Sequence, residues 1–157
     1  MEINIRNWRR DDLSEIRRAW LLFCQNVARS DMTIRRDADS AMKRWLESRI
    51  LEDDAFGLVA DAGDVVAGFL VARINDWESS PPIIVPRRIG IIDAVYVSSE
   101  FRHQGIGSQL IDRALARMRD ANALAVETIY DLSDESADRL WRRAGFSPWM
   151  VHAWRML

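Results

Sequence analysis

The sequence predicts an α/β fold of the α+β kind, in which a mixed, mostly antiparallel central sheet carries helices on both faces. Three observations support this prediction. The hydrophobic pattern alternates between helical and strand periods, and glycine and proline mark the changes. In addition, 157 residues with 48% apolar content suffice for one hydrophobic core but hardly for two. We therefore expect residues 1–157 to form a single domain with the element order β-α-α-β-β-β-α-β-α-β.

The first fifty residues predict one strand and two helices. Ile3 and Ile5 alternate with polar neighbours, as in a half-buried opening strand. The run Asp12-Leu13-Ser14-Glu15 matches a capping box, in which the carboxylate of Asp12 would accept hydrogen bonds from free backbone N–H groups at the start of a helix. The apolar stripe of this first helix consists of Leu13, Ile16, Trp20, Cys24 and Val27. A second helix begins after a cap at Asp37 or Asp39, and its stripe consists of Ala38, Met42, Trp45, Leu46 and Ile50.

The middle of the chain has the pattern of a sheet. Phe56–Ala60 and Val65–Ile74 are β-rich runs joined by Asp61-Ala62-Gly63-Asp64, whose glycine supplies the positive φ of a hairpin turn. Asn75–Arg88 contains three prolines, which lack the amide that a ladder needs, so we expect a surface loop there. Ile89–Val97 is an apolar run interrupted by one aspartate, which is typical of a strand covered on both faces.

The last third predicts two more helices and two more strands. Gly105–Asp120 has a helical apolar stripe, and Leu124–Tyr130 is rich in strand-forming residues. Asp134–Arg143 is a predicted helix that Gly145 ends in the left-handed conformation. Trp149–Met156 alternates in the manner of a closing strand.

Composition limits the classes of function. The chain has 22 cationic and 24 acidic residues and a net charge of −2, so no overall basic field favours nucleic acid. No run of residues is apolar enough for a membrane span, and the start lacks the layout of a signal peptide. A lone Cys24 excludes an internal disulfide and a cysteine zinc site. We therefore expect a cytoplasmic protein that uses no metal.

The segment that follows the strand Ile89–Val97 predicts a phosphate site. It holds Gly105 and Gly107 and leads directly into a helix. Glycines let the backbone approach an anion closely, the first helical amides have no internal partners, and the helix dipole adds about half a positive charge. An ATP-type loop needs two glycines spaced by four residues and followed by lysine, and no such run exists.

A dinucleotide-binding enzyme stays as a distant alternative. Gly105-Ile106-Gly107-Ser108-Gln109-Leu110 contains the first two glycines of that fingerprint, and Glu127 lies about twenty residues further on. Leu110 stands where the third glycine would allow close packing of helix on strand, and the loop follows a late strand rather than an initial one.

A third pattern, Arg/Gln-x-x-Gly-x-Gly/Ala, is met by Arg102-His103-Gln104-Gly105-Ile106-Gly107. With the strand end Val95-Tyr96-Val97 and the later Ala137-x-x-Leu140-Trp141-x-x-x-Gly145-Phe146, the chain resembles the GNAT superfamily of N-acetyltransferases over nearly its whole length. The resemblance implies that acetyl-CoA is the co-substrate and that an amine, of a small molecule or a protein N-terminus, attacks the thioester directly. The residues it assigns to acetyl-CoA are Val95, Val97, Arg102, His103, Gln104, Gly105, Ile106, Gly107, Ser108 and Asp134.

The resemblance also implies how the thioester is held. Amides of the loop would hold the pyrophosphate, and the strand end would pair with the pantetheine arm. The strand Leu124–Tyr130 would part from its neighbour to leave a gap, and an exposed amide near Val97 would polarise the thioester carbonyl. Where the family commonly has a tyrosine that protonates the departing thiolate, this chain has Trp141, so water or another donor such as Tyr130 would take that role.

Two carboxylates are candidates for removing the proton of the amine, whose pKa lies near 10.4 when free. Asp93 interrupts an apolar strand two residues before Val95, which predicts that both side chains share a face; the alternative is an ion pair with Arg87 or Arg88. Glu127 interrupts the next strand, and the alternative to a catalytic role is an exposed or arginine-paired glutamate on the surface.

Two further expectations concern the chain as a whole. A CoA-binding regulatory module without turnover remains open, because Trp141 and Asp134 depart from the family pattern. The resemblance also allows a homodimer, formed through edge strands or through the Trp-bearing terminus.

Overall fold

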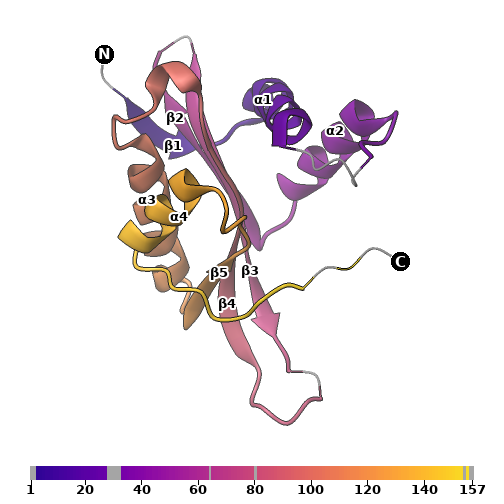
Figure 1. Cartoon of the computed structure of the whole chain (residues 1–157), viewed down its shortest axis with the longest axis vertical. Coiled ribbons are helices and arrows are strands. Elements are labelled where there is room, and N and C mark those ends of the chain that lie inside the picture. The colour runs from indigo at the N-terminus through magenta and orange to yellow at the C-terminus, as the bar shows by residue number, and fades with distance from the viewer. Residues whose placement is uncertain (1–2, 28–32, 64, 80, 154, 156–157) are drawn as a thin grey trace.

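The computed structural model describes residues 3–27, 33–63, 65–79, 81–153 and 155. These residues form one five-stranded sheet between two layers of helices (Figure 1). In chain order the elements are β1 (Asn4–Asn7), α1 (Leu13–Val27), α2 (Ala38–Arg49), β2 (Ala55–Asp61), β3 (Val66–Trp77), β4 (Arg87–Val97), α3 (Ile106–Asp120), β5 (Ala125–Thr128) and α4 (Glu135–Arg143). Short 3-10 turns lie at Arg10–Asp12 and Ser99–Phe101.

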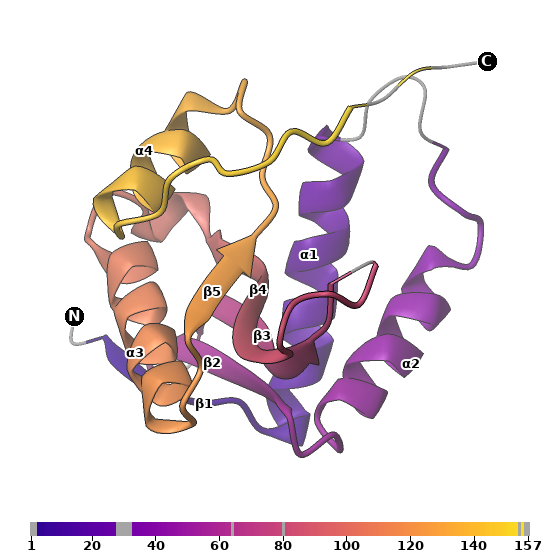
Figure 2. The same cartoon turned by 90° about the horizontal axis from the view of Figure 1, so that it is seen from below.

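The sheet has the strand order β1-β2-β3-β4-β5. Each pair from β1 to β4 is antiparallel, and β4 pairs with β5 in parallel. Seen from below, α1 and α2 cover one face while α3 and α4 cover the other (Figure 2). The predicted fold class, a mostly antiparallel mixed sheet with helices on both faces, is confirmed.

Each face of the sheet has its own cluster of buried apolar side chains. The α3-side core includes Phe56, Leu58, Leu70, Ala72, Ile74, Ile92, Ile106, Leu110, Ile111, Met118 and Trp141. The α1-side core consists of Leu13, Ile16, Leu46, Val59, Phe69 and Val71. From Phe69 to Ala72, successive residues of β3 alternate between the two cores, as the pleat of a strand covered on both faces requires.

The hairpin between β2 and β3 is confirmed, but the predicted loop Asn75–Arg88 is too long. The ladder of β3 and β4 continues to the pair Trp77 and Arg87, so residues 78–86 alone connect the two strands. The prolines fall inside this shorter connection, and the residues flanking them keep amides that can pair. The hairpin formed by β3 and β4 projects from one end of the sheet (Figure 1).

Asp93 is the extra residue of a β-bulge in β4. Val71 pairs with Ala94 and the next residue, Ala72, pairs with Ile92, so Asp93 has no counterpart in β3. The extra residue reverses the alternation of the strand. Ile92 lies in the α3-side core, whereas Ala94 packs against the α1-side core.

The predicted closing strand Trp149–Met156 is wrong for its described residues, 149–153 and 155, which form no strand. Trp149 is 79% exposed and Val151 is 88% exposed. Alternation alone does not make a strand, because a strand needs a partner, and Pro148 removes an amide where pairing would begin. Within the described residues β5 therefore pairs with β4 alone.

The helix starts are capped in different ways. Asp134, for which no cap was predicted, caps α4, because its Oδ1 accepts from the backbone N–H groups of Ser136 at 2.9 Å and Ala137 at 3.0 Å. Asp37 stands at the cap position of α2, but its carboxylate pairs with Arg35 rather than with helix amides. Asp12 does not cap α1 in the predicted way, because its carboxylate accepts hydrogen bonds from the side chain of Arg6 and from the backbone N–H of Arg9.

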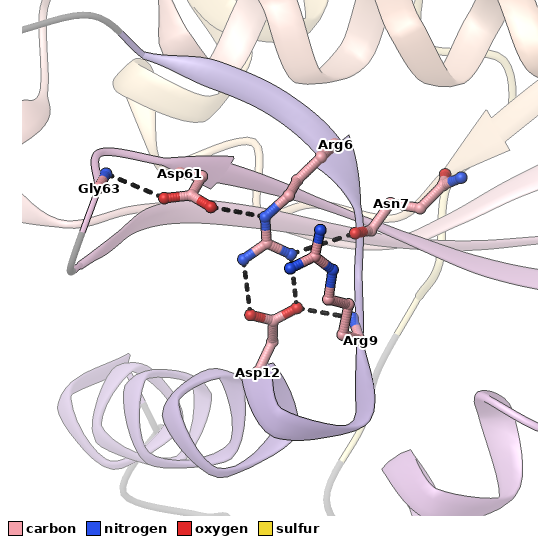
Figure 3. Close-up of polar contacts among 6 residues, drawn as sticks. All are labelled: Arg6, Asn7, Arg9, Asp12, Asp61 and Gly63. Atoms are coloured by element: carbon pink, nitrogen blue, oxygen red, sulfur yellow. Dashed lines mark hydrogen bonds and ion pairs between the residues drawn. The ribbon is translucent and has the colours of Figure 1, made fainter.

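Arg6 joins β1 to β2 and to the start of α1 (Figure 3). Its two terminal nitrogens donate to the two carboxylate oxygens of Asp12, both at 2.8 Å, and its Nε donates to Asp61 at 2.6 Å. The N–H of Arg9 adds a further hydrogen bond to Asp12 at 2.6 Å. Because Asp12 is only 8% exposed, this cluster fixes the first helix to the edge of the sheet.

Candidate active site

The loop between β4 and α3 presents backbone amides to solvent. His103 and Gly105 have φ values of 63° and 78°, and α3 begins directly after Gly105. Among the described residues, none accepts a hydrogen bond from the backbone N–H groups of His103 to Ser108, while the N–H of Gln109 closes the first helical turn on Gly105. The first turn of α3 contains no acidic residue. These amides and the helix dipole suit an anion such as a pyrophosphate.

Two polar side chains of this loop donate hydrogen bonds to nearby backbone carbonyls. The Nε of Arg102 donates to the carbonyl of Val97 at 3.1 Å, and the Nε2 of Gln104 contacts the carbonyl of Glu100 at 3.5 Å. Arg102, His103 and Gln104 are exposed, while Ile106 is buried beneath the loop. The backbone amides, rather than these side chains, are therefore the groups of the loop that are suited to an anion.

The structure requires glycine at one of the two glycine positions of the loop. A Cβ atom on Gly105 would meet only Nε2 of Gln109, at 3.9 Å, so this residue is needed for its positive φ. A Cβ on Gly107 would lie 3.4 Å from Cδ1 of Leu140 and 3.8 Å from Cγ2 of Val97. These are ordinary van der Waals distances, so a Cβ would fit at Gly107.

β5 ends about halfway along β4. Their pairing runs from Ile89 and Ala125 to Ile92 and Thr128, where the hydroxyl of Thr128 donates to the carbonyl of Ile92 at 3.1 Å. Within the described part of the chain, no strand pairs with β4 on that side from Asp93 to Val97. An unpaired strand edge thus leads from the bulge to the anion-binding loop, with Val95 and Val97 packed against the α3-side core.

Asp93 pairs with Arg73 of β3, and the predicted alternative partners Arg87 and Arg88 are wrong. The Nε of Arg73 lies 3.2 Å from both oxygens of Asp93, and the side chains of Arg73 and Asp93 are 27% and 17% exposed. Arg73 alternates with Ala72 and Ile74 of the α3-side core, so the pair lies on the α1 side. The expected shared face with Val95 is therefore wrong, because the bulge intervenes.

Sequence reasoning missed Arg73, although a signal for it exists. Arg73 is the one charged side chain in the run Val66–Ile74, where every neighbour is apolar or glycine. A charged side chain in a strand that is covered on both faces needs a group of opposite charge beside it. Glu127, by contrast, is exposed on β5 and has no hydrogen bond or ion pair with another described residue.

Tyr130 lies two residues beyond β5 and contacts α4. Its hydroxyl donates to Oδ1 of Asp138 at 2.9 Å, and Asp138 accepts from Nε of Arg142 at 2.7 Å. Burial and the hydrogen bond to Asp138 raise the pKa of Tyr130, while the hydrogen bonds from Arg142 and Tyr130 lower the pKa of Asp138. The ring of Tyr130 lies 6.2 Å from that of Trp141, which is 5% exposed.

Asp138 and Arg142 were missed as well. Their spacing of four residues on a helix is a sign of an ion pair, but a sequence pattern does not show that the phenol of Tyr130 joins it. Within the described residues no cluster of metal-binding side chains occurs, and none of the helices combines the length and the apolar character that crossing a bilayer requires.

Among the described residues, a helix start with unpartnered amides lies beside the unpaired edge of β4, an arrangement suited to the pyrophosphate and the extended arm of a CoA thioester. Residues 10–146 match the family described as the acetyltransferase (GNAT) family, and the chain belongs to this family. It is an N-acetyltransferase by class, with acetyl-CoA as co-substrate. An uncharacterized N-acetyltransferase of Archaeoglobus fulgidus is 30% identical over 125 residues, which are 80% of this chain and 80% of that protein.

Solved structures show the same fold. A transcriptional regulator from Bacillus halodurans C-125 has a TM-score of 0.79 at 19% identity, and the match covers 99% of this chain and 100% of that one. The aminoglycoside N-acetyltransferase AAC(6')-Iy in complex with CoA has a TM-score of 0.76 at 17% identity and covers 99% of this chain and 95% of that one. At such identities the likeness concerns architecture.

Proposed function

We propose that this chain transfers the acetyl group of acetyl-CoA to the amine of a small molecule or a protein N-terminus, by direct attack of the amine on the thioester. The observation that carries the proposal is the row of unpartnered amides from His103 to Ser108 beside the unpaired edge of β4. A pyrophosphate binds well to such amides, and an extended amide-containing arm binds well to a strand edge.

The roles follow from this placement. The amides of His103–Ser108 hold the pyrophosphate, and the backbone of Val95–Val97 pairs with the arm. Acetyl-CoA supplies the activated acetyl group. An amide near Val97, on the unpaired edge of β4, donates to the thioester carbonyl. Asp134, whose Oδ1 is committed to capping, contributes by fixing the start of α4 beside the site.

Asp93 is the proposed general base. The Arg73 guanidinium orients its carboxylate, and the bulge places it beside the end of β5. The amine then approaches from the α1 side, gives its proton to Asp93 and attacks through the gap. Glu127 is the second candidate for this role. It is supported by its place in β5 but not by any partner.

Two measurements test the proposal. Calorimetry should detect binding of acetyl-CoA and much weaker binding of acetyl-pantetheine, which lacks the pyrophosphate. A panel of amines with mass detection should then reveal an acetylated product. Absence of acetyl-CoA binding at millimolar concentration would contradict the proposal at its first step.

The second candidate function, a CoA-binding module without turnover, is favoured by one observation. Trp141 stands at the position of the expected acid and is buried, with no hydroxyl to donate. This version requires binding of acetyl-CoA without release of free thiol for any amine in the panel. Release of thiol in the presence of an amine decides against it.

We also infer the setting in which the enzyme works. The lone Cys24 and the moderate net charge favour a cytoplasmic protein acting on small amines, without nucleic acid or a membrane as partner. The whole chain works as one domain, because a single sheet carries both cores. A homodimer is proposed through the free edge of β5, and sedimentation analysis of the purified chain tests it.

A further inference from the structure

Tyr130 occupies a particular place in the gap between β4 and β5. The strands are last paired at Thr128, so the chain has just left the sheet where Tyr130 stands. Its ring is half-buried, packs with the α3-side core and leans on Trp141. The phenol therefore lies on the side of the sheet that also carries Val95, Val97 and the anion-binding loop.

The hydroxyl of Tyr130 is held by a chain of two hydrogen bonds. Arg142 and Asp138 are one helical turn apart on α4 and are joined at 2.7 Å, so the carboxylate is ionised and can only accept. Tyr130 must then be the donor in its 2.9 Å contact with Asp138. This contact fixes the oxygen of the phenol, and its hydrogen can reach sulfur only by turning away from Asp138 about the C–O bond.

The reaction needs a donor near this place. When the amine displaces the thiol, negative charge develops on sulfur, and a hydrogen-bond donor lowers the free energy of that state. Trp141, at the position where the family resemblance expects a tyrosine, has an indole N–H that does not ionise usefully. The phenol of Tyr130, whose ring lies beside that of Trp141, supplies the O–H group that Trp141 lacks.

We propose that Asp138, anchored by Arg142, is a positioning residue that holds the Tyr130 hydroxyl at the gap, and that this hydroxyl protonates the departing thiolate. The inference rests on the proposed function. In the step, the N–C bond forms and the C–S bond breaks, and the proton of the nitrogen passes to Asp93. The proton of Tyr130 passes to sulfur, and water then returns a proton to the phenolate.

Burial and the contact with Asp138 also keep the phenol protonated. Asp138 and Arg142, both on α4, are the charged groups that act on it, and the α3-side core around its ring is apolar. Burial and Asp138 raise its pKa and Arg142 lowers it, with a net rise. Tyr130 thus retains its proton at alkaline pH, where more of the amine substrate is in the neutral, attacking form.

A spectroscopic titration tests the positioning step without any turnover. The chain has two tyrosines, Tyr96 and Tyr130, so in a Tyr96→Phe chain the tyrosinate absorbance reports Tyr130 alone. Adding Asp138→Asn should move the midpoint to lower pH, toward the ordinary value near 10. Glu135→Gln is the matched control, because it removes an exposed carboxylate from the same helix and should leave the midpoint in place.

Kinetics test the catalytic step in the native background. Tyr130→Phe and Asp138→Asn should each lower kcat about tenfold or more while the KM for acetyl-CoA stays unchanged, and Glu135→Gln should change neither. Full kcat in the Tyr130→Phe chain, or an unmoved tyrosinate midpoint in the Asp138→Asn chain, overturns the inference. If the wild-type chain binds acetyl-CoA but acetylates no amine, the proposed function fails and the catalytic role of Tyr130 fails with it. The titration alone then decides whether Asp138 holds the phenol.

Discussion

The Nε atom of Arg73 lies 3.2 Å from each carboxylate oxygen of Asp93, across two adjacent strands. This contact joins a guanidinium from a regular part of β3 to the one residue of β4 that has no counterpart in the ladder. The ion pair therefore orients a carboxylate at the point where β4 leaves its regular course. A charge-assisted contact of this kind is short and directional, so it fixes the position of the half-buried carboxylate.

Replacing Asp93 by Asn should lower kcat by about tenfold to a hundredfold, because the variant cannot take the proton of the amine. Binding of acetyl-CoA should be unchanged, since the anion-binding loop is untouched. Steady-state kinetics and calorimetry measure the two effects. Asp76→Asn is the control, because it removes an exposed carboxylate from β3. If the Asp93→Asn chain keeps full activity while a Glu127→Gln chain loses kcat by a comparable factor, Glu127 rather than Asp93 is the base.

Replacing Gly105 by Ala should weaken acetyl-CoA binding. An L residue at φ of 78° costs about 1–2 kcal/mol, and relaxing this strain would turn the loop amides away from a common point. Calorimetry measures the affinity and thermal melting measures the stability. Gly145→Ala is matched in strain, with φ of 86°, and should lose similar stability while keeping its affinity. Equal affinity loss in both chains would mean that the effect is not specific to the loop.

The cluster of Arg6, Asp12 and Asp61 should make stability depend on acid pH. Burial alone would raise the pKa of Asp12, but the hydrogen bonds from Arg6 and from the N–H of Arg9 outweigh it and lower the pKa; Arg6 also lowers the pKa of Asp61. A carboxyl whose pKa falls on folding stabilises the protein fully above its unfolded value, about 3.9, and loses this contribution as the pH drops through the folded value. Melting temperatures should therefore fall steeply below about pH 4.

An Asp12→Asn chain provides the comparison. At pH 7 it should be less stable by about 1–3 kcal/mol, because a nearly buried charged hydrogen-bond partner of Arg6 is lost. Its melting temperature should respond less to acid than that of the wild type. Parallel curves for the two chains would show that other carboxyls determine the acid response.

Replacing Gly57 by Ala should destabilise the fold by about 1–3 kcal/mol. The new Cβ would overlap the ring of Trp8, whose backbone N–H donates to the carbonyl of Gly57 at 3.0 Å, so the indole would have to move. Chemical denaturation followed by tryptophan fluorescence measures both the loss and the change of environment. Gly63→Ala serves as a contrast, since a Cβ there meets no atom within 4 Å and only the turn conformation resists it.

Much of the fold could be predicted because its signals are local. Gly63 marks a turn, the four-residue spacing of Ile106 and Leu110 marks a helix face, and the apolar run before Val97 marks a covered strand. The strand expected from Trp149 failed because pairing is a long-range property, and alternation in one segment carries no information about a partner. The strand ends near Trp77 and Arg87 were missed because proline effects reach only the adjacent residues.

The candidate site divides in the same way. The anion-binding loop is readable because Gly105 and Gly107 stand just before a helix, and its amides are as free as the pattern predicts. The bulge at Asp93 is invisible in the sequence, since one extra residue leaves an apolar run looking continuous. The partners of Asp93 and Tyr130 come from β3 and α4, and only folding brings Arg73 and Asp138 to them.

The unpaired edge of β4 has one more consequence, which concerns handling of the protein. Exposed amides and carbonyls along a strand invite any extended peptide, including a segment of another molecule, to add itself as a neighbour. Aggregation and cofactor binding would thus compete for the same hydrogen bonds. Concentrated solutions kept with CoA should scatter less light during storage than solutions without it.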